Sequence, residues 1–187
     1  MKILLSSFII FIIIYTFAQE ETSISKQYEL LDTLNNVEIR AYKESTNASY
    51  YSDLNSKKNN YFRNLASYIF GGNSEKKNIN MTSPVTMRLY GKREMIFRMP
   101  DGFSIESLPK ADNPSINLIV IPSCVKATIK YGGYTNNKIE NKKINELINV
   151  LAKNKIKHNN KFEVLVYNSP YKIINRKNEI AVNITYP

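Results

Sequence analysis

The stretch 61–89 decides the fold: it reads YFRNLASYIFGG, then a polar spacer, then INMTSPVTMRL. Its first part carries apolar residues at three- and four-residue steps, the spacing of one buried helical face: Tyr61, Phe62, Leu65 and Ile69. Gly71-Gly72 can adopt the left-handed conformation that ends a helix. After the spacer, polar and apolar residues alternate up to Leu89, as on a half-buried strand, and Pro84 interrupts the alternation. The stretch therefore predicts a helix, a tight exit and a kinked strand.

The first 18 residues have the layout of a secretory signal peptide. Lys2 precedes a mostly apolar run from residue 3 to 17, and Ala18 supplies a small residue at the expected cleavage point. The run is short against the ~20 residues that span a bilayer. We therefore expect export to a secreted or periplasmic location, a flexible lead-in over residues 19–27, and a single domain over residues 28–187. A retained membrane anchor is the alternative.

The chain is basic, with 26 Lys and Arg against 16 Asp and Glu and a formal net charge of +10. Such a charge attracts anionic partners of several kinds. Much of it lies in Lys- and Asn-rich segments typical of a solvated surface, and no zinc-finger, homeodomain or RNP-type pattern accompanies it. We therefore expect a monomer without a nucleic-acid partner, which meets a membrane only through the signal peptide before cleavage.

One cysteine and one histidine limit the chemistry. Cys124 lies in an apolar, strand-like segment and allows no internal disulfide. His158 lies in the polar segment KHNN, and one His with one Cys cannot assemble the usual zinc site. The sequence offers neither a paired-carboxylate site nor a nucleophile–histidine arrangement. It therefore predicts no metal site, no catalytic residues and no enzyme activity.

Strand patterns surround two helical patterns. They lie at 28–31, 37–42, 48–51, 93–99, 116–121, 125–131, 162–167 and 179–185, in addition to the kinked strand. A second helix is expected after Asn137, with Glu140 as a capping-box partner, and the proline-containing segment 104–115 is expected to be a long surface loop. These elements predict an α+β fold in which two helices pack on one continuous antiparallel sheet.

Three kinds of element recur at one offset of 86 positions, which suggests an internal duplication. The matched pairs are Thr82-Ser83-Pro84 with Asn168-Ser169-Pro170, Ile39-Arg40-Ala41 with Val125-Lys126-Ala127, and Phe62 and Leu65 with Ile148 and Leu151. The prediction is a duplicated strand-helix-strand repeat over about 28–103 and 114–187. A groove between two such halves is a natural ligand site.

Five separated motifs resemble the SOUL haem-binding protein family. They are Val37-Glu38-Ile39-Arg40-Ala41-Tyr42, Tyr68-Ile69-Phe70-Gly71-Gly72-Asn73, Met81-Thr82-Ser83-Pro84-Val85, Gly132-Gly133-Tyr134 and Arg176-Lys177-Asn178-Glu179-Ile180. The resemblance covers residues 28–185 in order. It implies a duplicated α+β domain with a twisted antiparallel sheet or distorted barrel flanked by two helices. The activity it implies is non-covalent binding of haem or another porphyrin, without catalysis.

The resemblance also implies a tetrapyrrole site. Matching through Gly71-Gly72 puts ligand-facing positions of the first helix at Asn60, Arg63, Ser67 and Tyr68, and matching through the C-terminal motif puts the family's lysine at Lys172. Arg63 and Lys172 can pair with two propionates, and Tyr68 offers a flat face for stacking. The helix face at 60, 63 and 67 is polar, however, and contributes little to holding an apolar macrocycle. That face therefore fits either a ligand site or the solvated side of a surface helix.

These observations together predict an exported tetrapyrrole carrier or buffer without a strong axial protein ligand. His158 is far in sequence from the first helix, and the methionines of the strand patterns fit core positions: Met81, Met87, Met95 and Met99. The alternative is a small-molecule or protein-interaction module on the same fold without haem affinity.

Overall fold

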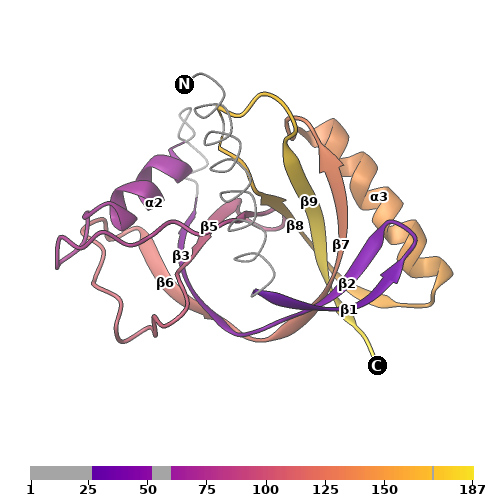
Figure 1. Cartoon of the computed structure of the whole chain (residues 1–187), viewed down its shortest axis with the longest axis horizontal. Helices are drawn as coiled ribbons and strands as arrows, with labels where there is room; N and C mark the ends of the chain where they lie inside the picture. The colour runs from indigo at the N-terminus through magenta and orange to yellow at the C-terminus, as the bar shows by residue number, and fades with distance from the viewer. Residues whose placement is uncertain (1–26, 52–59, 170) are drawn as a thin grey trace, which may run out of the picture.

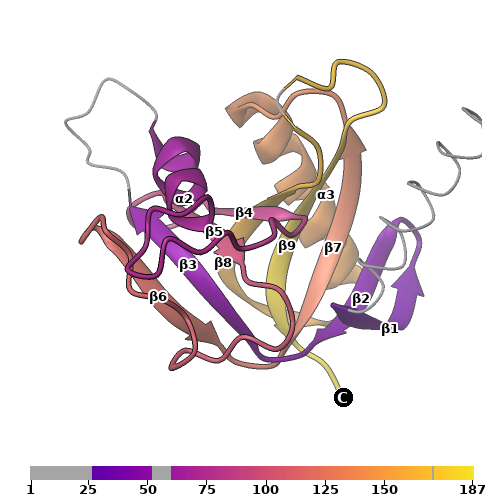
Figure 2. The same cartoon turned by 60° about the vertical axis from the view of Figure 1, so that its left-hand side comes forward.

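The computed structural model describes residues 27–51, 60–169 and 171–187. The predicted signal peptide, and all of the lead-in except Gln27, lie outside the described residues. The described chain is an α+β fold in which an antiparallel sheet curves beneath two helices (Figures 1 and 2). This confirms the predicted fold class.

The sheet has nine strands. In chain order they are β1 (Tyr28–Leu34), β2 (Val37–Tyr42), β3 (Ser45–Tyr51), β4 (Val85–Arg88), β5 (Glu94–Arg98), β6 (Ile116–Ile121), β7 (Cys124–Gly132), β8 (Lys157–Val166) and β9 (Lys177–Thr185). Their order across the sheet is β1-β2-β7-β9-β8-β4-β5-β3-β6, with every pair antiparallel. The sheet is open, because β1 and β6 are edge strands.

The helices α2 (Tyr61–Ile69) and α3 (Asn137–Lys153) cover the same face of this sheet. Met87 of β4 packs with the core under α3, and Met95 of β5 packs with the core under α2. Met87 and Met95 are direct register partners, so they point to the same face. Within the described ranges, neither helix is long and apolar enough to cross a bilayer.

Side-chain hydrogen bonds set the start of α3 one residue earlier than predicted. Asn136 is the N-cap, and its side-chain oxygen accepts from the backbone N–H of Ile139 at 3.0 Å. Glu140 accepts instead from the hydroxyl of Thr135 at 2.8 Å. The predicted start after Asn137 is therefore wrong by one position.

Two strand predictions also change. Of the stretch 79–89 only β4 is a strand. The segment before it contains a cis Ser83–Pro84 peptide and bonds through side chains: Thr82 Oγ1 donates to the Arg98 carbonyl at 2.6 Å. Strand β8 begins at Lys157, so His158 lies in a strand and not in a loop. A register shift between His158 and Phe162 separates this polar start from the apolar part of β8, which hides it from pattern analysis.

The duplication stays a prediction, and the 86-residue offset does not mark equivalent positions. The sheet is symmetric about the β8–β4 pair. Counted outward from this pair, the strands β8, β9, β7 and β2 on one side correspond to β4, β5, β3 and β6 on the other. In that scheme the hairpins β2–β3 and β6–β7 correspond at 79 positions (116 − 37 and 124 − 45). The offset of 86 instead joins Arg40 to Lys126, which are cross-strand partners in β2 and β7.

The sheet face opposite the helices carries buried ion pairs. Arg40 is fully buried and donates to both carboxylate oxygens of Glu179, at 2.7 and 2.9 Å. Glu38 accepts from the same guanidinium at 2.6 Å, and the Tyr167 hydroxyl donates to Glu179 at 2.7 Å. Burial by itself lowers the pKa of Arg40, but the hydrogen bonds and charges of Glu179 and Tyr42 together outweigh burial and raise the pKa above its ordinary value. Arg40 therefore stays charged.

We expect Glu179→Gln to lower the free energy of unfolding by about 3 kcal/mol, because it leaves the buried Arg40 charge only partly compensated. Urea unfolding at neutral pH measures this. Asp112→Asn is the matched control: it breaks the 2.7 Å pair with Lys76, whose partners are 74% and 48% exposed, and should cost less than about 1 kcal/mol. Equal losses in the two variants would contradict a structural role for the buried pair.

Candidate functional site

The two faces of α2 differ from the prediction at Phe62 and Tyr68. The buried residues are Tyr61, Leu65, Tyr68 and Ile69, whereas Phe62 is 41% exposed and packs its ring edge on Phe97. Positions 61, 65 and 68 follow the i, i+4, i+7 spacing of a single helical face. Tyr68 is therefore a core residue, with a side chain that is fully buried. The stacking role stays a prediction, and it would require this side chain to become exposed.

Burial also fixes the chemistry of Tyr68. Its hydroxyl donates to the Pro109 carbonyl at 2.9 Å, inside the loop that crosses over α2. Burial, with a smaller contribution from the charge of Glu75, raises the pKa of Tyr68 to about 12. The phenol thus remains protonated at neutral pH.

Asn60, Arg63 and Ser67 lie exposed along the outer face of α2, as their spacing predicts. Asn60 is the N-cap residue, and its carbonyl accepts from the Asn64 N–H at 3.0 Å. Ser67 lies against the glycine pair, since a Cβ at Gly72 would stand 2.9 Å from the Ser67 hydroxyl. Of this face, Arg63 is the residue that brings a charge to the surface.

Lys172 lies half-buried in the β8–β9 loop, whose described residues are 167–169 and 171–176. Arg176 organises this loop by donating to the carbonyls of Ser169 at 2.7 Å and Lys172 at 2.8 Å. The Lys177 N–H closes it through the Asn168 side chain at 2.6 Å. In both views the loop rises beside the upper ends of β7 and α3, whereas α2 lies over the half of the sheet that contains β3, β5 and β6 (Figures 1 and 2). The side chain of Asn178 agrees with this position of the loop, because it donates to the Gly133 carbonyl at 2.7 Å at the end of β7.

Three exposed apolar residues surround Lys172, and sequence reasoning missed them. Tyr171, Ile173 and Ile174 are 90%, 77% and 75% exposed. They follow neither the helical nor the strand period, so periodicity gave them no role. The signal that could have indicated them is the group of apolar residues around Lys172 in a segment that has neither helical nor strand periodicity.

The glycine motif builds the end of α2. Gly71 has φ +96°, a conformation that favours glycine. Asn73 is fully buried and donates to the carbonyls of Tyr68 at 2.9 Å and Lys77 at 2.8 Å. The Asp112 N–H bonds to the Gly72 carbonyl at 3.0 Å and fastens the 104–115 loop across this turn. The motif thus fixes the end of α2 and ties it to the 104–115 loop.

The possible iron ligands lie in different places. His158 is near the start of β8, and the β8–β9 loop follows the other end; eight strand residues at ~3.3 Å each separate them by roughly 25 Å. Met99 is buried, and Met87 and Met95 pack at the edges of the cores. Met81 is 45% exposed in the segment before β4, in contrast to the core position predicted. No group of three or more potential metal ligands occurs in the described ranges.

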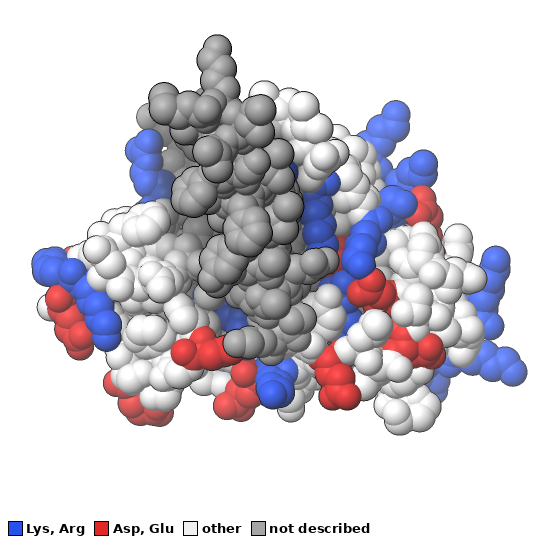
Figure 3. All heavy atoms as spheres, viewed as in Figure 1, with Lys and Arg blue, Asp and Glu red and all other residues white. Residues whose placement is uncertain are grey.

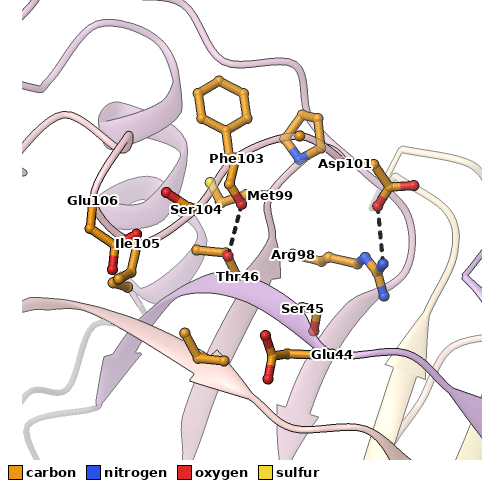
Figure 4. Close-up of a pocket in the computed structure, with 13 residues that line it drawn as sticks. Glu44, Ser45, Thr46, Arg98, Met99, Asp101, Phe103, Ser104, Ile105 and Glu106 are labelled. Atoms are coloured by element: carbon orange, nitrogen blue, oxygen red, sulfur yellow. Dashed lines mark hydrogen bonds and ion pairs between the residues drawn. The ribbon is translucent and has the colours of Figure 1, made fainter.

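A pocket of about 330 Å³ lies elsewhere, between the start of β3 and the turn after β5 (Figure 4). Its charged lining consists of Glu44, Asp101, Glu106 and Arg98, and Arg98 is paired with Asp101 at 3.1 Å. The Thr46 hydroxyl bonds across it to the Phe103 carbonyl at 2.9 Å. With three carboxylates around one paired arginine, this pocket disfavours a ligand that carries carboxylates.

The family model described as SOUL heme-binding protein matches residues 24–183. The chain belongs to the SOUL haem-binding protein family. No curated protein matches the chain. The match spans most of the chain and includes all five motifs that carried the resemblance.

Solved structures with the same fold share little sequence with this SOUL protein. A structure described as a hydrolase from Listeria innocua has a TM-score of 0.62 at 11% identity, covering 90% of this chain and 98% of the other. The C-terminal domain of EcmrR has a TM-score of 0.56 at 12% identity, covering 86% and 99%. EcmrR in a DNA complex has a TM-score of 0.59 at 11% identity, covering 94% and 64%. At these identities the likeness concerns the fold alone.

We expect Tyr68→Phe to lower the free energy of unfolding by about 1–2 kcal/mol while leaving any ligand binding unchanged, because it unpairs a buried carbonyl and touches no surface. The pKa of Tyr68 is higher in the folded state than its ordinary value of 10.0, so its contribution is lost as pH rises from about 10 towards 12. Urea unfolding at pH 7 and pH 11 should therefore show that the difference in the free energy of unfolding between the natural chain and Tyr68→Phe is smaller at pH 11. A weaker tetrapyrrole affinity in this variant would instead return Tyr68 to the site.

Proposed function

We propose that this SOUL-family protein binds haem or another tetrapyrrole reversibly, between the outer face of α2 and the β8–β9 loop. The observation that carries the proposal is the family match over residues 24–183. The exposure of the residues supports it, because Arg63 is exposed on α2 and Lys172 is half-buried on the β8–β9 loop, so each brings a cation to the surface. The role is that of a carrier or buffer rather than an enzyme.

Each part of a tetrapyrrole has a counterpart among these residues. The propionates would pair with Arg63 and Lys172 through charge-assisted hydrogen bonds. The macrocycle would lie against Ile173 and Ile174, whose full burial is worth about 1.5–3 kcal/mol each. The apolar contact that the polar face of α2 lacks thus comes from the β8–β9 loop.

The iron contributes little to this proposed mode. His158 lies roughly 25 Å along β8 from the loop, which leaves it out of reach of a ligand held there. Haem and metal-free protoporphyrin IX should therefore bind with similar affinity. The protein would distinguish its ligands from other small molecules by their carboxylates and apolar area, and it would not distinguish haem from the metal-free porphyrin.

The proposal includes an exported monomer that does not bind nucleic acid. The predicted signal peptide supports export, and the absence of a nucleic-acid motif supports the latter part. The alternative is a small-molecule or protein-interaction module without haem affinity, which the polar residues Asn60, Arg63 and Ser67 favour. Titration with a tetrapyrrole separates the two.

The test is a titration of the full chain with haem and with protoporphyrin IX, followed by Soret absorbance. We expect saturable one-to-one binding, weakened about tenfold in Arg63→Ala and in Lys172→Ala, since each loses one charge-assisted bond worth about 1.4 kcal/mol. Lys142→Ala removes an exposed cation from α3 and should leave the affinity unchanged.

The dimethyl ester of protoporphyrin IX sharpens this test, because it has no carboxylates. With the ester, Arg63→Ala and Lys172→Ala should bind as the natural chain does. Absence of saturable binding to every porphyrin would favour the interaction module. Binding that ignores both substitutions would move the site away from α2 and the loop.

A further inference from the structure

The tip of the β8–β9 loop exposes more apolar surface per residue than any other part of the described chain. Tyr171, Ile173 and Ile174 are 90%, 77% and 75% exposed, and the next large apolar side chain, Phe70, is 65% exposed. Three such side chains within four residues form a cluster, unlike the scattered apolar residues normal on a protein surface.

The backbone holds these side chains outward. Arg176 occupies the inside of the loop and binds the carbonyls on either side of the tip, at Ser169 and Lys172. Tyr167 and Lys177 close the base through a backbone hydrogen bond of 3.2 Å, and Asn175 turns the chain with φ +53°. Because polar groups fill the inside of the loop, its apolar residues cannot fold inward.

The surroundings of the tip are basic. No acidic residue occurs between Glu163 and Glu179, whereas Lys172, Arg176 and Lys177 fall in that interval. In Figure 3 the acidic side chains of the visible face gather mainly along its lower rim, away from the upper rim where Figure 1 shows this loop. Lys172 and Lys177 therefore flank the apolar tip in the sequence, whereas Arg176 is 8% exposed and fills the inside of the loop.

Aromatic residues sit at the base of the same loop. Tyr134 is 50% exposed, and its ring lies 4.3 Å from the Arg176 guanidinium. Tyrosine has an apolar ring and a polar end, which suits the level of lipid headgroups. The apolar tip, two lysines and an exposed tyrosine thus supply side chains for both the acyl boundary and the headgroup level of a bilayer.

We propose that the β8–β9 loop docks this protein on a lipid bilayer with anionic headgroups. Tyr171, Ile173 and Ile174 enter the boundary between headgroups and acyl chains, and the lysines at 172 and 177 meet the headgroups. This adds a membrane contact that the sequence did not predict. Docking uses Lys172, Ile173 and Ile174, which the proposed tetrapyrrole site also uses, but it requires no tetrapyrrole and is therefore tested without one.

The chain has no tryptophan, so one introduced residue gives an unambiguous signal. The full chain with Tyr171→Trp is mixed with phosphatidylcholine vesicles that contain roughly one-third phosphatidylglycerol, without tetrapyrrole. We expect the emission to shift to shorter wavelength, and the shift to weaken as salt screens the headgroups. A reporter at Leu30→Trp, on the edge strand β1, should not shift.

Charge-matched variants isolate the loop. Ile173→Asp with Ile174→Asp, in the Tyr171→Trp background, should lower vesicle partition at least tenfold. Leu30→Asp with Val120→Asp introduces the same charge at apolar residues that are 54% and 44% exposed on the two edge strands, and should leave partition unchanged. Residues 1–26 are the same in all variants, so their contribution cancels in the comparison.

Three results would overturn the proposal. They are no shift of the loop reporter, equal losses in the two double variants, and a shift without vesicles that grows with protein concentration, which would mean that a second copy covers the tip. The haem titration is independent: docking can fail while tetrapyrrole binding holds, and the reverse outcome is equally readable.

Discussion

The ion pair between Arg40 and Glu179 is the constraint on which the rest of the sheet depends. Arg40 starts on β2, spans β7 and reaches both oxygens of Glu179 on β9, so three strands must keep one register for the bond to form. Thr128 of β7 is buried between them on the same face. A buried charge is costly unless fully paired, so this contact selects one register more strongly than an apolar contact could.

The same contact explains why the family motifs occur where they do. Arg40 belongs to the motif at 37–42 and Glu179 to the motif at 176–180, which means that two distant motifs meet in one bond. The glycine motif ends α2, and Arg176 builds the β8–β9 loop. The residues that identify the family thus mainly hold structural elements together. Arg63, Lys172 and the apolar residues of the β8–β9 loop lie at the surface and carry the proposed functions.

Patterns in the sequence predicted most elements but erred where the packing decides. Phe62 was expected on the buried face of α2 and Tyr68 on its ligand-facing side, but the structure has the reverse. The Tyr68 hydroxyl can be buried because it donates to the Pro109 carbonyl, and the ring of Phe62 packs against Phe97 at the edge of the core. His158 joined β8 because β9 offers it a partner, Ile184, which no local pattern reveals. The apolar residues around Lys172 had no period and therefore no predicted role.

The sequence by itself determined the family, the α+β class, the two helices with most strands, and the polar outer face of α2, because these follow from motifs and local periodicity. Only the tertiary structure decided that both helices share one sheet face, that Tyr68 is buried, and that the base of the loop carrying Lys172 lies against the end of β7. These facts depend on strand order and on contacts between residues far apart in the chain, and such pairings leave no mark on the spacing of neighbouring residues.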